Sequence, residues 1–559
     1  MDIFIYIGIC VCLLVFFAYQ SNVSKKNKIY EMNAKIDRSW GVLPDRAYKT
    51  GEIDKVRKYF DLRKKQSYID DITWNDMGMD EVFKTINHTW SSIGEDCLYD
   101  RLRSMEYSDE ELKEFDKLVD NMIEKQKDTT NVQQSFMSLG RTKSVCIYEF
   151  ISKLASLKEK KNTEHIIRCI LLLCSIGLLF VQPIIGIISL LIMVSTNVIR
   201  YYRVKKDIED YFTCFAYIMN MIVSSKDISD KSKDISPDIS KELADIYSDV
   251  IGMTKGVFLI AGNNMSGSLA DSLMEYVRML CHVDIMRFNS MMRDVRKHED
   301  KLKRMYELIG LLETACAIAS YRAYLKNEYG FYCKPIFSNE GINGVSLYHP
   351  LLKNPVANSI DECKSVLLTG SNASGKSTFL KTIGINAILA QTIYTATGQN
   401  FSLRRCKVYS SMSLKDDVIG GESYYMVEIK ALKRIVDAAR RDESIICFVD
   451  EVLRGTNTVE RVSASTEILR HLATHYGHKI ICFAATHDIE LTYLLEDIYS
   501  NYHFEEQVID EDVLFNYELN IGRATSRNAI QLLKVMGYDD DIISRARERA
   551  DRFIKTGQY

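Results

Sequence analysis

The stretch Gly370-Ser371-Asn372-Ala373-Ser374-Gly375-Lys376-Ser377 decides how this chain can be interpreted. It fits the pattern G-x-x-x-x-G-K-[ST], whose glycine-rich backbone turns its N–H groups toward a polyphosphate. The apolar run 365–369 before it predicts a buried strand, and the run after it predicts a helix whose N-terminus favours anions. We expect residues 370–378, ending at Thr378, to bind ATP, with Lys376 at the β and γ phosphates and Ser377 on Mg²⁺. A chance strand–turn–helix match is the alternative.

Two later apolar runs end in residues that would complete such a site. One is followed by Asp450 and Glu451, and the next by Thr486-His487. A buried parallel strand can deliver carboxylates beside a phosphate loop, where Asp450 would hold Mg²⁺ and Glu451 would polarise the attacking water. His487 would hydrogen-bond the γ-phosphate. The plainer alternatives are an exposed acidic pair and a structural histidine. We expect Glu451, His487 and the loop lysine to carry out ATP hydrolysis.

A glycine pair upstream adds a further candidate. Gly420-Gly421-Glu422-Ser423 precedes a helix that starts near Tyr424, and such a turn exposes N–H groups and a hydroxyl. It lies away from the strand ends, so we expect Ser423 to contact the nucleotide of a partner subunit. That arrangement requires a homodimer with two composite sites.

Length and composition limit the class of protein. With 559 residues the chain is too long for one core, and 47% hydrophobic residues with only 6 prolines indicate a mostly helical, well-packed protein. A net charge of −3 provides no global attraction to nucleic acid, so any such contact must be local. The 14 cysteines show no C-x-x-C spacing, which indicates reduced thiols rather than a zinc site or disulfides.

Two uncharged stretches predict membrane segments. Ile3–Tyr19 is about long enough to span a bilayer, and the lysines at 25, 26 and 28 place its far end in the cytoplasm. A cleaved signal peptide is the alternative. Cys169–Ile199 is interrupted by Gln182-Pro183 and has basic residues on both sides, which predicts a hairpin of two short spans with cytoplasmic ends. A buried helical pair in a soluble core is the alternative there. The expected location is therefore the membrane, multi-pass, with the ATPase domain in the cytoplasm.

The resulting fold class is α + α/β, a long helical region followed by an α/β ATPase domain. The expected regions are a membrane helix at 1–20, helices at 27–162, the membrane hairpin at 166–200, a helical lever at 201–335, and the ATPase domain with a helical tail at 343–559. The polar stretch Ser224–Ser240, in which Lys-Asp-Ile-Ser recurs, predicts a loop.

Taken together, the motifs resemble the MutS family of ATPases. The resembling pieces are Tyr348-His349-Pro350-Leu351-Leu352, the glycine-rich loop, residues 421–428, residues 450–458, Ala485-Thr486-His487 and the tail 528–550. The resemblance implies an ATP- and Mg²⁺-dependent dimeric clamp, with the tail in dimer contacts and long helices that transmit the nucleotide state. It also implies an association with DNA mismatch repair.

The chain departs from the family pattern in two places. Family members often carry an aromatic residue after the His-Pro motif to stack on adenine, whereas this chain has Asn354-Pro355-Val356. No globular domain precedes the helical region, so the mismatch-reading domain has no expected counterpart. We therefore expect the ATPase activity, and not the mismatch recognition, of that family.

Two other functions are weighed against this one. A clamp that tethers DNA to the membrane would use ATP only as a switch, but it needs a basic lining that the mixed charges of 293–304 do not supply. An ABC-type transporter ATPase would need more membrane spans, or an unidentified membrane partner. The expected partners are thus a second copy of the chain and the lipid bilayer, with DNA and a membrane protein left to test.

Overall fold

The computed structural model describes most of the chain. The described residues are 29–142, 145–156, 161–256, 269–371, 374–412, 424–441, 443–453, 456–509, 512–524 and 537–556, with single residues at 23, 27, 530 and 533. The predicted membrane segment Ile3–Tyr19, and with it the membrane helix expected over 1–20, lies outside these residues.

The chain divides into two compact units, and its fold is a mixture of helices and sheets, as the predicted fold class states. The helical unit comprises Met1–Arg63, Asn87–Asp100 and Lys117–Ser320. The sheet unit comprises Lys64–Ile86, Arg101–Asp116 and Tyr321–Tyr559. Both units are therefore assembled from segments that are far apart in the sequence.

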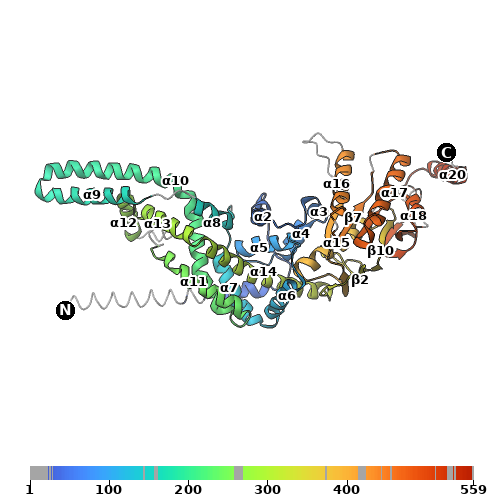
Figure 1. The fold of residues 1–559 in the computed structure, drawn as a ribbon, viewed down its shortest axis with the longest axis horizontal. Helices are drawn as coiled ribbons and strands as arrows, with labels where there is room; N and C mark the ends of the chain where they lie inside the picture. The colour runs from blue at the N-terminus through green and yellow to red at the C-terminus, as the bar shows by residue number, and fades with distance from the viewer. Residues whose placement is uncertain are drawn as a thin grey trace. The chain divides into compact units, whose positions relative to one another are not determined.

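The α-helices between residues 52 and 330 are labelled in Figure 1. They are α2 (Glu52–Arg63), α3 (Asp71–Asp76), α4 (Met79–Ile86), α5 (Ser92–Arg103), α6 (Asp109–Glu124), α7 (Gln126–Leu139), α8 (Ile147–Ser156), α9 (Thr163–Val181), α10 (Pro183–Ser232), α11 (Pro237–Val250), α12 (Leu269–Cys281), α13 (Val283–Lys297) and α14 (Glu299–Tyr329), and the short 3-10 helix η1 (Ile251–Thr254) follows α11.

A fully buried carboxyl group lies in the core of the helical unit. Asp96 of α5 is 0% exposed, and the hydroxyl of Tyr306 in α14 donates a 2.7 Å hydrogen bond to its Oδ2. Burial raises the pKa of Asp96 to about 8, because the charged form loses its hydration. The side chain therefore holds its proton over much of the neutral range.

The apolar stretch 169–199 folds as a pair of helices joined at the predicted break. Helix α9 ends at Val181, Gln182 stands alone, and α10 begins at Pro183, which suits a first helical position because it has no N–H to leave unpaired. The two helices run side by side (Figure 1). Within the described residues, Thr163–Val181 and Pro183–Ile208 are long and apolar enough to cross a membrane, judged by length and composition alone.

The predicted loop at Ser224–Ser240 is wrong. Helix α10 continues to Ser232 and α11 starts at Pro237, so only residues 233–236 lie outside a helix. The serines are small enough to sit at the contact between the two helices, where the hydroxyls of Ser229 and Ser240 each donate to the carbonyl of the other residue. Ile228 beside them is fully buried, so the polar composition conceals a packed interface.

The described residues of the sheet unit form two sheets. The strands are β1 (Ile336–Phe337), β2 (Ile342–Leu347), β3 (Asn358–Glu362), β4 (Ser365–Thr369), β5 (Asn400–Leu403), β6 (Lys407–Ser411), β7 (Ile445–Asp450), β8 (Ile480–Ala485), β9 (Tyr499–Ile509) and β10 (Asp512–Ile521). The helices after residue 330 are α15 (Lys376–Ile393), α16 (Tyr424–Ala439), α17 (Thr458–Thr474), η3 (Gly477–Lys479), α18 (Ile489–Leu494) and α20 (Asp540–Thr556).

The strand order of the larger sheet places its functional ends together. That order is β10-β9-β4-β8-β7-β6, and all neighbours are parallel except β10 with β9. The smaller sheet has the order β1-β5-β2-β3. Because parallel strands end at the same edge, the segments after β4, β7 and β8 lie next to one another.

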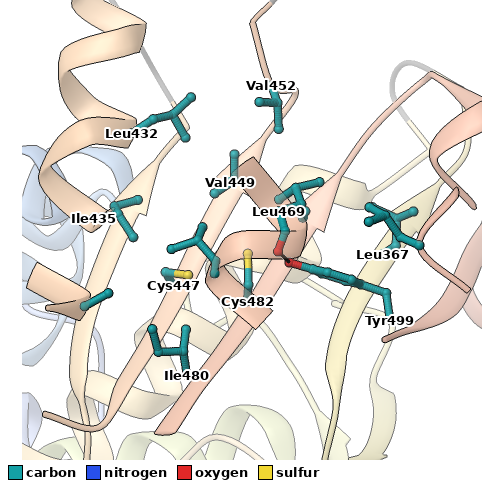
Figure 2. Packing of buried hydrophobic residues seen from close by; sticks show 14 of the residues in the cluster. Leu367, Leu432, Ile435, Cys447, Val449, Val452, Leu469, Ile480, Cys482 and Tyr499 are labelled. Carbon is teal, nitrogen blue, oxygen red and sulfur yellow. Dashed lines mark hydrogen bonds between the residues drawn. The ribbon is translucent and has the colours of Figure 1, made fainter. Parts of the chain in front are cut away.

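A dense apolar core holds these strands in place. Figure 2 shows Leu432 and Ile435 of α16 beside Cys447 of β7, in a cluster that also includes Leu469 of α17. Tyr499 of β9 closes it, and its hydroxyl donates to the carbonyl of Leu469 at 3.0 Å. Each large apolar side chain buried in this way contributes roughly 1.5–3 kcal/mol. This packing fixes the positions of the strands and therefore of the residues at their ends.

The twelve cysteines that the structure describes are all free, and only Cys174 and Cys363 among them are exposed.

Candidate functional site

The glycine-rich loop, residues 370–375, connects the end of β4 with the start of α15. Every residue of β4 is buried. Gly370 and Gly375 have φ values of 148° and 110°, which residues other than glycine rarely adopt. A Cβ at Gly370 would lie 2.8 Å from Ser374 Oγ and 2.9 Å from the carbonyl oxygen of Phe504. Glycine is therefore required here by close approach as well as by conformation.

Lys376 folds back onto this loop. Its ammonium group donates hydrogen bonds of 2.7 Å to the carbonyl oxygens of both Gly370 and Ser371. The residue is only 5% exposed. The positive charge is thus held at the centre of the loop. Of the other predicted loop residues, Asn372 and Ala373 lie outside the described residues, whereas Ser371, Ser374 and Thr378 line the adjoining pocket.

Ser377 and Asp450 meet at the strand ends. The hydroxyl of Ser377, in the first turn of α15, donates a 2.5 Å hydrogen bond to Asp450 Oδ2 at the end of β7. Asp450 is paired in register with Ala485 of β8. Two oxygen groups that favour Mg²⁺ therefore lie together beside the loop.

Glu451 and His487 form a second contact at the same edge. The Nε2 atom of His487 is 3.0 Å from Glu451 Oε1 and 3.5 Å from the ammonium nitrogen of Lys376. It can donate to the carboxylate or accept from the ammonium group, but one tautomer cannot do both. Glu451 has a φ of 57°, and its N–H donates to Ala485 at 2.9 Å. This left-handed backbone is costly for glutamate and turns the side chain toward the histidine.

A pocket of about 650 Å³ opens beside these groups. Its walls include Leu347, His349, Leu352, Lys353, Asn354, Pro355, Val356, Ser371, Ser374, Lys376, Ser377, Glu451, His487, Phe504 and Tyr517. It thus joins the glycine-rich loop to the Asn354-Pro355-Val356 segment, and the volume is of the size that small-molecule ligands occupy. Burial lowers the pKa of His349 in this wall to about 4, so the imidazole is neutral at physiological pH.

Sequence reasoning missed Tyr517, an aromatic wall of this pocket. The pairing of β10 with β9 shifts register between Phe515 and Leu519, and Tyr517 lies within that irregularity at a φ of 56°. Asn358 fixes the bulge, since its amide donates to the Tyr517 carbonyl at 2.9 Å and its oxygen accepts from Leu519 at 2.7 Å. The Cδ1 atom of Tyr517 lies 3.3 Å from where a Cβ on Gly375 would be.

The predicted contact of Ser423 with a partner's nucleotide falls outside the structure. Ser423 and the glycine pair before it lie outside the described residues.

Across the described ranges, no cluster of three or more His, Cys, Asp or Glu side chains could hold a metal ion. Asp450 and Ser377 fit Mg²⁺ nevertheless, because that ion is usually held by one or two protein oxygens together with phosphate and water.

Comparison with known proteins agrees with this geometry. Residues 366–554 match the family model of MutS domain V. The chain is 30% identical over 279 residues to the DNA mismatch repair protein MutS of Thermotoga sp. (strain RQ2), which covers 48% of this chain and 34% of that protein. It is 29% identical over 259 residues to the DNA mismatch repair protein MutS 2 of Halobacterium salinarum, covering 44% and 29%.

A third relative gives a similar result. The DNA mismatch repair protein MutS of Bacillus velezensis is 27% identical over 297 residues, covering 51% of this chain and 33% of that protein. The chain thus spans about a third of the length of these curated relatives. The strand ends, the glycine-rich loop and the matched domain coincide in one region of the chain, and this region, residues 366–554, belongs to the MutS domain V family.

Proposed function

We propose that this protein binds and hydrolyses ATP at the edge of the six-stranded sheet, through a MutS-type ATPase domain at residues 343–559. The observation that carries the proposal is the convergence of Lys376, Ser377, Asp450, Glu451 and His487 beside a pocket of about 650 Å³. An ammonium group, a hydroxyl and two carboxylates are groups that support phosphoryl transfer to water, and an imidazole can add a hydrogen bond to the γ-phosphate.

Each residue has a distinct role in this proposal. Lys376 would exchange its bonds to the loop carbonyls for bonds to the β and γ phosphates, and Ser377 and Asp450 would hold Mg²⁺, which neutralises phosphate charge when bound. Glu451 would orient and polarise the attacking water. His487, within reach of both Glu451 and Lys376, would hydrogen-bond the γ-phosphate. Tyr517 would supply the aromatic surface for the base that the segment 354–356 lacks.

We further propose that the working form is a homodimer that closes as a clamp. Its support is the match of residues 366–554 to MutS domain V, together with the expectation that Ser423 reaches the nucleotide of a second subunit. The helices of residues 27–162 and 201–335 would then transmit the nucleotide state.

Membrane attachment is the aspect of the proposal that concerns the helical unit. The apolar side chains of α9 and α10 lie on the surface rather than in a core, with Phe180 86% exposed and Ile184 75% exposed. Basic residues flank the pair on both sides, which favours cytoplasmic ends and a cytoplasmic ATPase domain. Ile3–Tyr19 would add a second attachment.

DNA is the effector to test first, since the relatives are named DNA mismatch repair proteins. We propose that DNA, rather than a mismatch as such, is the ligand. ATP hydrolysis by the detergent-solubilised protein would be compared without DNA, with homoduplex, with mismatched duplex and with lipid. Stimulation by both duplexes alike would support a clamp without mismatch recognition, whereas stimulation by the mismatch alone would contradict it. Stimulation by neither duplex would exclude DNA as the effector.

The ATPase proposal itself is tested with Lys376→Ala. We expect its affinity for ATP to fall roughly 10- to 100-fold, because charge-assisted hydrogen bonds to phosphate are lost. Lys364→Ala is the matched control, since Lys364 is an exposed lysine that immediately precedes β4, at the end opposite the loop. Equal ATP affinity and hydrolysis in Lys376→Ala and wild type would overturn the proposal.

A further inference from the structure

The apolar helix pair ends in a turn that is both very short and uncharged. Only Gln182 separates α9 from α10, and no charged residue occurs between Cys169 and Ile199. The most exposed side chains of the pair cluster at this turn, with Phe180 86%, Val181 77% and Ile184 75% exposed. A turn that emerged into water on the far side of a membrane would be expected to be longer and more polar.

The turn is compact because the two backbones touch. A Cβ added to Gly186 would lie 2.6 Å from the backbone nitrogen of Leu179, so only glycine permits this approach. The N–H of Gln182 donates to Leu178 at 2.8 Å, and its carbonyl accepts from Gly186 at 2.9 Å. Pairing of these groups lowers the cost of placing the turn in hydrocarbon, where water cannot satisfy them.

The opposite end of the pair is marked by ions. Glu164 bonds to Arg168 at 3.1 Å within α9 and to Arg200 of α10 at 2.9 Å. Closer to the turn than these ions, the helix pair contacts the end of α12, next to its junction with α13. There the thiol of Cys169 donates to the Cys281 carbonyl at 2.9 Å, and the amide of Asn197 donates to the Leu280 carbonyl at 3.0 Å. The length free to enter lipid therefore begins beyond Cys169 and Asn197.

That free length is shorter than a bilayer. Residues 170–181 and 183–196 are uncharged helix, and at 1.5 Å per residue they extend about 18 Å and about 21 Å. The hydrocarbon core is about 30 Å thick. With Cys169 and Asn197, where the pair is held to α12, at one interface, the turn passes the midplane and stops about 10 Å short of the far interface.

We propose that α9 and α10 form a hairpin that enters the bilayer from the cytoplasmic side and keeps its turn inside the hydrocarbon, rather than two spans that cross it. This inference rests on the proposed membrane attachment and specifies its depth. In this arrangement lipid acyl chains surround the uncharged turn and contact its exposed apolar side chains. A two-span arrangement would instead draw Cys169, Asn197 and the end of α12 that they contact into hydrocarbon, or thin the membrane.

Depth-dependent quenching distinguishes these arrangements. The full-length variants Phe180→Trp and Leu173→Trp would be reconstituted in vesicles of phosphatidylcholine that carries bromines either near the headgroup or near the acyl-chain end. Tryptophan fluorescence would be measured, and the wild-type signal of the three native tryptophans would be subtracted. Phe180 is at the tip, whereas Leu173 is 67% exposed about one turn beyond Cys169. We expect Phe180→Trp to be quenched at least two-fold more by the deep bromines, and Leu173→Trp more by the shallow ones.

The reverse order would overturn the proposal, because a crossing pair puts position 173 near the midplane and position 180 at the far interface. If neither variant is quenched more than wild type, the proposal that this helix pair attaches to the membrane is itself contradicted. ATP binding, measured on the same preparations, reports separately on the sheet unit, so failure of the hairpin and failure of the ATPase proposal are distinguishable.

Discussion

The hydroxyl of Ser377 donates a 2.5 Å hydrogen bond to Asp450 Oδ2, although 73 positions separate the two residues. One belongs to the helix after β4 and the other to the end of β7, with β8 lying between those strands. The contact shows that the strand order, and not proximity along the chain, assembles the candidate site.

Removal of either oxygen should weaken the response to magnesium. In Ser377→Ala and Asp450→Asn we expect the Mg²⁺ concentration for half-maximal ATP hydrolysis to rise roughly 10-fold or more, since one ligand or its partner is lost. A magnesium titration of the steady-state rate measures this. Ser463→Ala, at an exposed serine of α17, is the control. An unchanged titration in both site variants would mean that these residues do not hold the ion.

Glu451→Gln should separate binding from hydrolysis. The amide keeps the size of the side chain but cannot polarise water as a carboxylate does, so we expect ATP affinity to be kept and the single-turnover rate to fall at least about 100-fold. Glu443→Gln, at the residue two positions before β7 and hence at its opposite end, should hydrolyse ATP normally. Wild-type turnover by Glu451→Gln would remove this carboxylate from the mechanism.

Tyr517→Ala should reduce affinity for the base rather than for the phosphates. Stacking of a base on an aromatic side chain contributes about 1–3 kcal/mol, so ATP should bind at least about 5-fold more weakly, while tripolyphosphate binds as before. Tyr517→Phe should retain both affinities. Calorimetric titration of the three proteins decides, and an equal loss for tripolyphosphate would indicate a collapsed bulge instead of a lost stacking surface.

Asp96 predicts a pH-dependent stability of the helical unit. Its pKa is raised to about 8 in the folded protein, whereas an unfolded aspartate titrates near its ordinary value of about 3.9. Between these values the folded state holds a proton that the unfolded state has released, so the contribution to stability is complete below about pH 4 and declines up to about pH 8.

Asp96→Asn cannot titrate and should flatten this decline. The stability of the variant minus that of wild type should therefore be larger at pH 8 than at pH 5. Thermal melts of both proteins in the same detergent measure this difference. Asp37→Asn, at an exposed aspartate, is the matched control. A stability difference between Asp96→Asn and wild type that does not change with pH would contradict the assigned burial effect.

Some elements of the fold could be predicted because a local pattern has one physical solution. The run 365–369, the glycines and Lys376 describe a strand, a turn and a helix start, and Pro183 marks a helix start after a break. The serine-rich segment Ser224–Ser240 misled, because a small polar residue can either face water or fill a tight contact between helices. Composition does not distinguish these two environments.

The residue pattern alone therefore determined the positions of the loop, of the acidic pair at the end of β7 and of the apolar helix pair, since each depends on neighbours within a few residues. Tertiary structure decided which groups touch. It placed β8 between β4 and β7, brought His487 to 3.0 Å from Glu451, and turned Tyr517 toward the loop through a bulge pinned by Asn358. Those contacts join segments 36 to 159 residues apart, and their energies depend on strand order and register, which no local pattern encodes.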